Sequence, residues 1–511
     1  MATLQQRMAD SIGALDFLQE RGVVAVRASD LSRTHRERLL AQGGLQSVMK
    51  GWYVDSRLNA APGEATAWYA SFWDFCANYL NRRFGHEWSL SPEQSVVIHS
   101  GNRSVPTRLA ARSPGARNRI TALAHDTSLF ETRASLPPPD QTEVVDALRV
   151  FSLPAALLAS GPRLFTGHAN DARTVLATMR DVSGLVRLLI DGGRSTVAGR
   201  LAGAFRNIGR DSAADRILAT MKDAGYDVRE SDPFERPSPL TLDIQHISPY
   251  VVRLSLDWHT MRERVIAVFP EPPGVPSDWN VSLSSLDEVQ VDDACHSLAL
   301  EGLRVEPEFV ERLRGGEWTP DAATSYRERS AALAAMGYTA AFELVRESAA
   351  RAMQAIDPGA VAARDHAGWY RELVGPGVSA GILNAADVSG YRDGPIVIRH
   401  SRRIPPAGGA VRDAMPALFD LLAAESHPGV RAVLGHYMFA HVHPYTYGNG
   451  RMGRFLMNVM LVAGGYPWII VPAERRDTYM ASLETASIQQ DIGPFAEFLA
   501  GLVNDGRAPL A

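Results

Sequence analysis

The segment from His443 to Arg454 reads H-P-Y-T-Y-G-N-G-R-M-G-R and is the most informative part of this 511-residue chain. Gly448 and Gly450 allow a tight turn and a close approach of the backbone to a ligand. A helix that begins after this turn would offer unpaired N–H groups to an anion. The helix is predicted from apolar residues that recur with helical spacing: Met452, Phe455, Leu456, Val459 and Met460.

The polar residues of the same segment have the chemistry of a polyphosphate site. Arg451, Arg454 and Asn458 form a second stripe on the predicted helix. Arginine guanidinium groups match the geometry of phosphate oxygens. His443 stands just before the turn, where a neutral imidazole can take a proton from an attacking hydroxyl. The segment therefore predicts an anion site and a general base side by side.

This string resembles the signature of the Fic (Fido) family, H-P-F-x-D/E-G-N-G-R-x-x-R, whose members mostly transfer AMP from ATP to a protein hydroxyl. The resemblance extends over about 363–503 and implies a C-terminal all-α Fic fold with a β-hairpin flap. It also implies ATP as the donor and His443 as the general base. By the same resemblance, the residues that hold the nucleotide phosphates are Gly448, Asn449, Gly450, Arg451 and Arg454.

Two aromatic residues depart from the family signature. Tyr445 replaces the usual Phe, which is a mild change of an aromatic wedge. Tyr447 stands where the family places an Asp or Glu that holds Mg²⁺ on the phosphates. A phenol is a poor ligand for Mg²⁺, which prefers ionised oxygens or water. The sequence therefore predicts no metal ligand at this position and leaves the dependence on Mg²⁺ open.

Family resemblance also assigns a target-binding flap and raises the question of self-inhibition. Residues 394–403 read as a short β-hairpin, and the flap residues that would pair with an extended target segment are Ile396, Val397, Ile398 and Arg399. Many Fic proteins carry an inhibitory helix with the pattern S/T-x-x-x-E-G/N. Thr339–Glu343 and Thr324–Glu328 fit only its first part. We therefore assign no inhibitory glutamate from the sequence.

The composition of the chain is that of an ordinary globular protein. Hydrophobic residues make up 46% and charged residues 21%, and the net charge of −5 gives no global signal for nucleic acid. Cys76 and Cys295 lie far apart, which suits a reducing compartment. The N-terminus has no apolar signal region and no stretch is long enough to span a membrane. These features predict a cytoplasmic location without membrane contact.

The N-terminal region carries a second, weaker signal. A helix over 11–20, a short strand over 23–27, a basic helix to about Gln42 and a strand pair over 45–54 outline a winged helix-turn-helix. Its sequence resembles AbiEi-type antitoxins, transcriptional regulators of type IV toxin–antitoxin systems. Arg33, Arg36 and Arg38 of the basic helix are the predicted DNA contacts.

The remaining chain is less informative, and the whole is predicted to be multidomain and mainly α. The predicted parts are a winged-helix domain (1–58), an α+β domain that continues the AbiEi-like region (59–230), a connecting helical region (240–356) and the Fic domain (357–505). Residues 94–100 and 108–109 are predicted as strands, and 66–82 as a helix rich in aromatics. The histidines His436, His441 and His443 have no carboxylate at metal-site spacing, so no metal site is predicted.

The predicted function is transfer of AMP from ATP to a Ser, Thr or Tyr hydroxyl of a target protein. Because of Tyr447, three alternatives stay open. They are an enzyme with a different donor that needs no Mg²⁺, a degenerate Fic domain that binds nucleotide or protein, and a DNA-binding regulator of the toxin–antitoxin type. The sequence does not predict the target protein or the oligomeric state.

Overall fold

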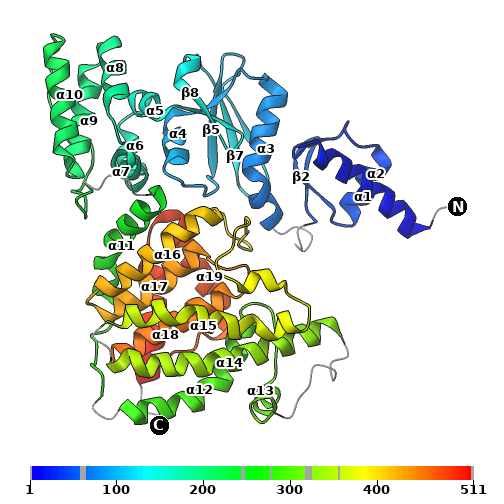
Figure 1. Cartoon of the computed structure of the whole chain (residues 1–511). Coiled ribbons are helices and arrows are strands. Elements are labelled where there is room, and N and C mark those ends of the chain that lie inside the picture. The colour runs from blue at the N-terminus through cyan, green and yellow to red at the C-terminus, as the bar shows by residue number, and fades with distance from the viewer. Residues whose placement is uncertain are drawn as a thin grey trace. The chain divides into compact units, whose positions relative to one another are not determined.

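The computed structural model describes residues 3–57, 65–242, 248–276, 279–316, 325–354 and 357–507. The chain divides into two compact units (Figure 1). Unit 1 is Met1–Arg253 with the inserted segment Val397–Ile404, and unit 2 is Leu254–Ile396 with Pro405–Ala511. The finer division into four domains stays a prediction. Within the described residues, no helix combines the length and apolar character needed to cross a bilayer.

Unit 1 begins with two helices and a small sheet. Helix α1 (Leu4–Glu20) and helix α2 (Arg33–Ala41) accompany a three-stranded antiparallel sheet in the order β1-β3-β2. Helix α2 starts at Ser32, whose side chain accepts a hydrogen bond from the backbone N–H of His35 at 3.2 Å. The strands are β1 (Val26–Arg27), β2 (Leu45–Met49) and β3 (Trp52–Asp55).

A mixed sheet and two flanking helices follow (Figure 1). The strand order is β4-β5-β7-β6, and β5 pairs with β7 in parallel. The helix predicted over 66–82 is confirmed as α3 (Thr66–Phe84), which buries its aromatic side chains against this sheet. The strands are β4 (Ser89–Leu90), β5 (Arg108–Ser113), β6 (Arg119–Ala122) and β7 (Ser128–Arg133).

The strand predicted over 94–100 is wrong, because this stretch forms helix α4 (Pro92–His99). Its β-branched residues are buried, which is compatible with either structure. The helix is initiated by Ser91, whose side chain caps the N–H of Gln94 at 3.2 Å, and by proline at the first helical position. The local N-terminal signals therefore outweigh the β-propensity of the run.

The rest of unit 1 is a β-ribbon followed by helices. Strands β8 (Thr142–Val145) and β9 (Leu148–Phe151) pair in antiparallel fashion. The helices that follow are α5 (Leu153–Ala159), α6 (Arg163–Gly167), α7 (Ala169–Thr178), α8 (Ser183–Asp191), α9 (Ser195–Asn207) and α10 (Asp211–Asp223).

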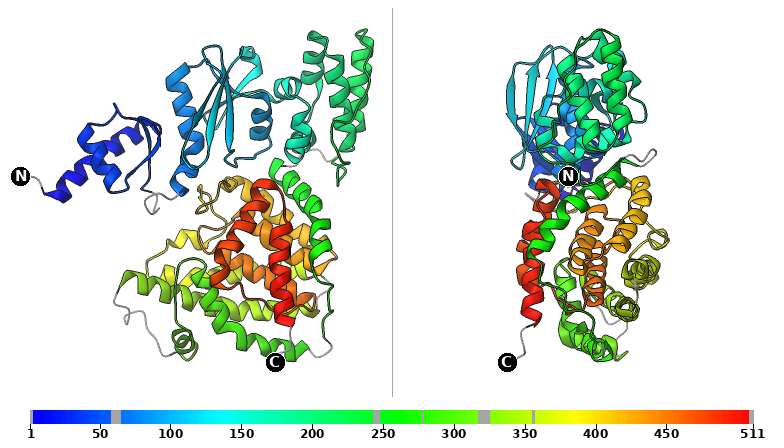
Figure 2. Two further views of the ribbon diagram at one scale, coloured as in Figure 1. Left: turned by 180° about the vertical axis from the view of Figure 1, so that it is seen from behind. Right: turned by 90° about the vertical axis from the view of Figure 1, so that its left-hand side faces the viewer.

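Unit 2 is helical and is built around α18 (Asn449–Ala463), which packs against α14, α15 and α17. Figure 2 shows the C-terminal helix α20 beside α11, where Arg264 pairs with Glu497 at 2.9 Å. The other helices are α11 (Pro249–Val268, which belongs to unit 2 from Leu254 on), α12 (Trp279–Ala299), α13 (Pro307–Arg314), α14 (Tyr326–Gln354), α15 (Pro358–Ser379), α16 (Gly408–Ala424), α17 (Pro428–Val442), α19 (Arg476–Gln489) and α20 (Gly493–Arg507).

Because α18 is buried at the centre of unit 2, removing its polar side chains from water costs free energy. Arg451 is 7% exposed and Arg454 is 3% exposed. A buried cation needs a paired charge and hydrogen bonds, because its removal from water is costly. Asn458 is also buried, and it exchanges two hydrogen bonds with the backbone of Ile469, at 2.9 and 3.0 Å. Asn458 therefore holds the loop after the helix, and the arginines require a partner from another element.

Candidate functional site

The turn between α17 and α18 is held by left-handed residues and by one asparagine. His443 ends α17 with φ 52° and Gly448 precedes α18 with φ 68°. The side chain of Asn449 stabilises the turn through two hydrogen bonds to the backbone of Tyr445. Its Oδ1 accepts a hydrogen bond from the N–H of Tyr445 at 2.9 Å. Its Nδ2 donates to the carbonyl of Tyr445 at 2.7 Å. The Asn449 side chain is thus committed to the loop, while the first N–H groups of α18 stay available for an anion.

The first aromatic departure from the family signature fits into the core. Tyr445 is 1% exposed and stacks on Tyr370 with 3.7 Å between ring centroids and 10° between planes. Burial raises the pKa of Tyr370 to about 12, so this phenol stays neutral. Tyr445 is therefore a buried aromatic side chain that packs beneath the turn.

The geometry around His443 assigns its tautomer. Its Nδ1 lies 3.3 Å from the carbonyl oxygen of Ala440, and a carbonyl oxygen only accepts. The Nδ1 atom therefore carries the proton in the neutral ring, which leaves the lone pair on Nε2. Arg392 donates from Nε to the carbonyl of His443 at 2.7 Å and from its backbone N–H to the carbonyl of Pro444 at 2.9 Å. These bonds hold the strained backbone at His443.

The partner of the two buried arginines is Glu301, just beyond α12. Its Oε2 accepts from Arg451 Nε at 3.0 Å and its Oε1 from Arg454 Nη2 at 3.2 Å. Arg454 also donates from Nε to the hydroxyl of Ser297 at 2.8 Å. Burial alone would raise the pKa of the Glu301 carboxyl, but the charges of Arg451 and Arg454 and their hydrogen bonds outweigh it and lower the pKa. Glu301 is therefore an anion bound to Arg451 and Arg454, the two arginines that were predicted to hold phosphate and that we call the phosphate clamp.

Glu301 was not among the residues predicted from the sequence, although the sequence around it carries a signal. Ser297 to Gly302 reads S-L-A-L-E-G and fits the inhibitory pattern S/T-x-x-x-E-G/N in full. The Thr339–Glu343 match lies on α14, where Glu343 pairs with Arg346 at 3.2 Å. The other match begins at Thr324, which lies outside the described residues.

The residues present do not form a magnesium site of the family type. Tyr447 is 40% exposed, and its phenol takes the place of the family's carboxylate. The nearby carboxylate of Asp387 accepts a hydrogen bond from Thr446 Oγ1 at 3.2 Å. Across the described parts of the chain, no group of three or more His, Cys, Asp or Glu is arranged to hold a metal ion.

One histidine near Arg454 is a core residue. His436 is fully buried, and its Nε2 lies 2.6 Å from the hydroxyl of Tyr479. Burial, helped by the charge of Arg454, lowers the pKa of His436 to about 3. The ring is therefore neutral at physiological pH and belongs to the core.

The prediction of a β-hairpin at 394–403 is wrong, because these residues form no β-strands. Val397–Ile404 belongs to unit 1 instead, where the Val105 N–H donates to the Arg402 carbonyl at 2.8 Å. Arg402 Nε donates back to the carbonyl of Val105 at 2.9 Å. The N–H of His400 donates to Thr66 Oγ1 at 3.1 Å. The segment thus finds its backbone partners in unit 1.

The arginines predicted to contact DNA are engaged within unit 1. Arg33 pairs with Glu37 at 2.7 Å on the exposed face of α2. Arg36 donates to the carbonyl of Ala28 at 2.5 Å. Arg38 donates to the carbonyl of Arg7 at 3.3 Å.

Comparison with known proteins identifies the region around this site. Residues 370–461 match the sequence model of the Fic/DOC family. Proteins named "Protein adenylyltransferase Fic" from Drosophila willistoni and Drosophila mojavensis are each 40% identical over 101 residues, which is 19% of this chain and 20% of each relative. The match thus spans about a fifth of the length of these curated relatives.

Solved structures give weaker matches. Fic-1 (aa134–508) from C. elegans is 18% identical, with a TM-score of 0.37, over 66% of this chain and 94% of that one. A Fic family protein from Desulfovibrio desulfuricans G20 is 22% identical, with a TM-score of 0.34, over 51% of this chain and 73% of that one.

Proposed function

We propose, from the premise that residues 370–461 are a Fic/DOC domain, that this chain transfers AMP from ATP to a Ser, Thr or Tyr hydroxyl of a target protein. The observation that carries the proposal is the arrangement at the α17–α18 turn. A histidine whose lone pair is on Nε2 stands beside a helix N-terminus and a pair of buried arginines. The name of the curated relatives, protein adenylyltransferase, agrees with this chemistry.

Phosphate binding is assigned to the start of α18. The N–H groups at Gly448, Asn449 and Gly450 carry the partial positive charge of the helix N-terminus, which favours the α-phosphate. The guanidinium groups of Arg451 and Arg454 hold the phosphates that leave. Fixed donors of this kind stabilise the charge that develops in the transition state without reorganisation.

Transfer then requires a base and an in-line nucleophile. His443 Nε2 takes the proton of the target hydroxyl, whose oxygen forms a bond to the α-phosphorus. The bond from that phosphorus to the bridging oxygen breaks, and pyrophosphate leaves with the electron pair. We assign target alignment to Ile396, Val397, Ile398 and Arg399 as the flap. No step is assigned to a metal, because Tyr447 does not fit as its ligand.

In this proposal Glu301 inhibits nucleotide binding and so acts as a brake on AMP transfer. Its carboxylate takes up hydrogen bonds from both arginines of the clamp. A terminal phosphate on the same groups would meet this negative charge, so nucleotide binds productively only after Glu301 withdraws. The resting state of the chain is therefore inhibited.

A transfer assay with α-labelled and γ-labelled ATP tests the function. The purified 511-residue chain is incubated with a lysate as the source of targets, with Mg²⁺, with Mn²⁺ and with EDTA. We expect protein-bound label from α-labelled ATP, more from Glu301→Gly, and none from His443→Ala. Label from γ-labelled ATP alone would show phosphate transfer by a different donor chemistry. No label with intact nucleotide binding would show a degenerate domain that serves as a binding module.

DNA binding by the N-terminal region is a second candidate function, favoured by the sheet order β1-β3-β2 beside α1 and α2. Neutralisation of phosphates by arginines makes such binding steeply dependent on salt. A salt-dependent gel shift that is lost in an Arg33→Ala, Arg36→Ala double variant would support it. A shift that survives these changes would remove α2 as the contact.

A further inference from the structure

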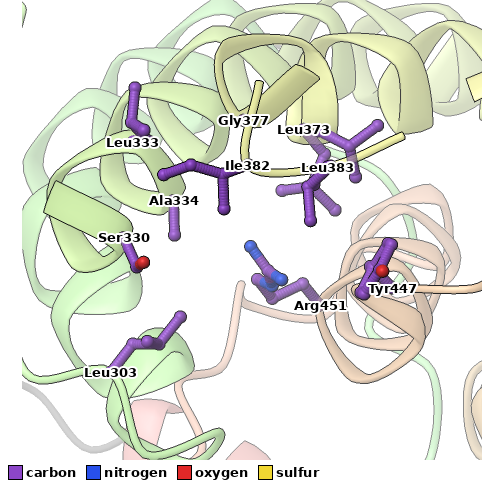
Figure 3. A pocket seen from close by; sticks show the side chains of 11 residues that line it. Leu303, Ser330, Leu333, Ala334, Leu373, Gly377, Ile382, Leu383, Tyr447 and Arg451 are labelled. Atoms are coloured by element: carbon purple, nitrogen blue, oxygen red, sulfur yellow. The ribbon is translucent and has the colours of Figure 1, made fainter. Parts of the chain in front are cut away.

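A pocket of about 170 Å³ lies in unit 2 beside Arg451, between α14, α15 and the loop after α15. Figure 3 shows Leu333, Leu373 and Ile382 around this space, with Ser330 and Arg451 facing it from different elements. The family signature does not account for most of these residues. Among the described residues of the lining, Arg451 and Tyr447 are the two that belong to the α17–α18 segment.

The size and walls of the pocket suit one aromatic ring. An apolar cavity of about 150 Å³ is known to accept benzene in other proteins. Most of the described residues that line this pocket are aliphatic. An aromatic ring in the pocket would make van der Waals contacts with them and would be removed from water.

Arg451 supplies a cation with unused donors. Its Nε is bonded to Glu301, but no hydrogen bond from either Nη is found among the residues that the structure describes. Among the described residues that line the pocket, Arg451 is the one that carries a charge. Guanidinium Nη groups that face a low-dielectric space favour an anionic partner.

Ser330 supplies a second polar contact. Its hydroxyl is buried and has no hydrogen-bond partner in the described part of the chain. A buried hydroxyl without a partner is unfavourable, and a ligand with a polar atom near α14 would satisfy it. An apolar slot with few convergent polar groups is the usual form of a small-molecule site.

We propose that this pocket binds a small aromatic anion, with its ring between Leu333 and Leu373 and its anionic group on Arg451. The Ser330 hydroxyl bonds a polar atom of the same ligand. Glu301 holds Arg451 through Nε and the ligand takes the Nη groups, so two anions share the charge of one guanidinium group and repel each other. The pocket is thus an effector site that weakens the hold of Glu301 on the clamp. This inference goes beyond AMP transfer and does not require it.

Calorimetric titration of the 511-residue chain with phenyl phosphate, without ATP, tests the proposal. Inorganic phosphate and phenol serve as the separate halves of the probe. We expect phenyl phosphate to bind more tightly than either half. Ser330→Ala should weaken binding about three- to tenfold, the effect of one hydrogen bond. Ala334→Phe fills the pocket and should abolish binding, and Arg329→Ala on the exposed side of α14 should leave it unchanged.

Competition provides a readout that a nonspecific apolar pocket would not give. Glu301→Gln keeps the shape of the side chain but removes its charge, so it should tighten phenyl phosphate binding about tenfold. Thermal unfolding of each variant establishes that it is folded. Equal binding of phosphate and phenyl phosphate, or unchanged binding in a folded Ala334→Phe variant, would overturn the proposal. Loss of AMP transfer alone would not affect it, because no step of the titration needs catalysis.

Discussion

The Glu301 carboxylate lies 3.0 Å from Nε of Arg451, although the two residues are 150 positions apart in the chain. The same carboxylate accepts from Nη2 of Arg454 at 3.2 Å. Buried arginines on a central helix are tolerated only with such a partner. The negative charge of Glu301 thus occupies the two arginines in the way that the phosphates of a nucleotide would.

Glu301→Gln should therefore raise AMP transfer. Loss of the negative charge frees both arginines for phosphate, and couplings between sites are typically 1–3 kcal/mol, so we expect an increase of about fivefold or more. The measurement is the initial rate of label transfer from α-labelled ATP. Glu306→Gln, at an exposed glutamate directly before α13, is the matched control and should behave like the wild type. Equal rates in both variants would remove Glu301 as the brake.

How much of this site follows from the sequence depends on the distance between its parts. The α17–α18 turn, the helix after it and the aromatic wedge are local, so His443 to Arg454 predicted them directly. Glu301 is remote, and its short pattern became meaningful only when the fold brought it to Arg451. The helix α4 illustrates the same limit, since a β-branched run was outweighed by the capping signal at Ser91.

The flap shows a different limit. Residues 394–403 have the composition of a hairpin, but a hairpin needs its two arms to pair with each other. In the fold Arg402 pairs with Val105 instead, so the backbone bonds go to a distant segment. Sequence patterning alone cannot choose between these partners because both satisfy the same groups.

Tyr447→Asp should create a dependence on divalent metal. The substitution restores a carboxylate, the hard oxygen ligand that Mg²⁺ prefers, at the position where the family carries one. We expect transfer by Tyr447→Asp to rise with Mg²⁺ and to fall with EDTA, while the wild type responds weakly to both. Tyr447→Phe is the control, since it removes only the phenol hydroxyl. An identical EDTA response in wild type and Tyr447→Asp would contradict the assignment.

Asp293 on α12 should make stability depend on pH. Burial raises its pKa to about 6, against the hydrogen bonds from Tyr338 (2.8 Å) and Trp468 (3.1 Å). Between the unfolded pKa of 3.8 and this value, the unfolded chain has lost a proton that the folded chain keeps. Rising pH therefore favours unfolding in that window, by about 3 kcal/mol in total.

Asp293→Asn should remove this loss, and urea unfolding at pH 4 and at pH 6.5 measures it. The comparison is the difference between variant and wild type at each pH, because buried His436 has the opposite dependence and is present in both. We expect the variant to gain relative stability as pH rises. A difference that is constant with pH would show that Asp293 ionises normally.

Asn449→Asp should loosen the α17–α18 turn without unfolding the unit. The aspartate keeps an acceptor for the Tyr445 N–H but no longer donates to the Tyr445 carbonyl. Leaving that buried carbonyl unpaired costs about 1–3 kcal/mol. We expect a lower melting temperature and a slower transfer rate with nucleotide binding weakened in parallel. Asn458→Asp is the control, because it disturbs the hydrogen bonds to Ile469 on the same helix and not those of the turn. An equal loss of transfer in both variants would argue against a specific role of the turn.

Val105→Pro should release the segment Val397–Ile404 within unit 1. Proline has no N–H, so the hydrogen bond from Val105 to the Arg402 carbonyl is lost. Val105 is 1% exposed, and Val105→Ala therefore serves as the control that shortens the side chain but keeps the N–H. Hydrogen exchange of the peptide over 397–404 is the measurement. We expect faster exchange in Val105→Pro than in Val105→Ala, because exchange reports local opening. Equal exchange in the two variants would mean that this hydrogen bond does not hold the segment in place.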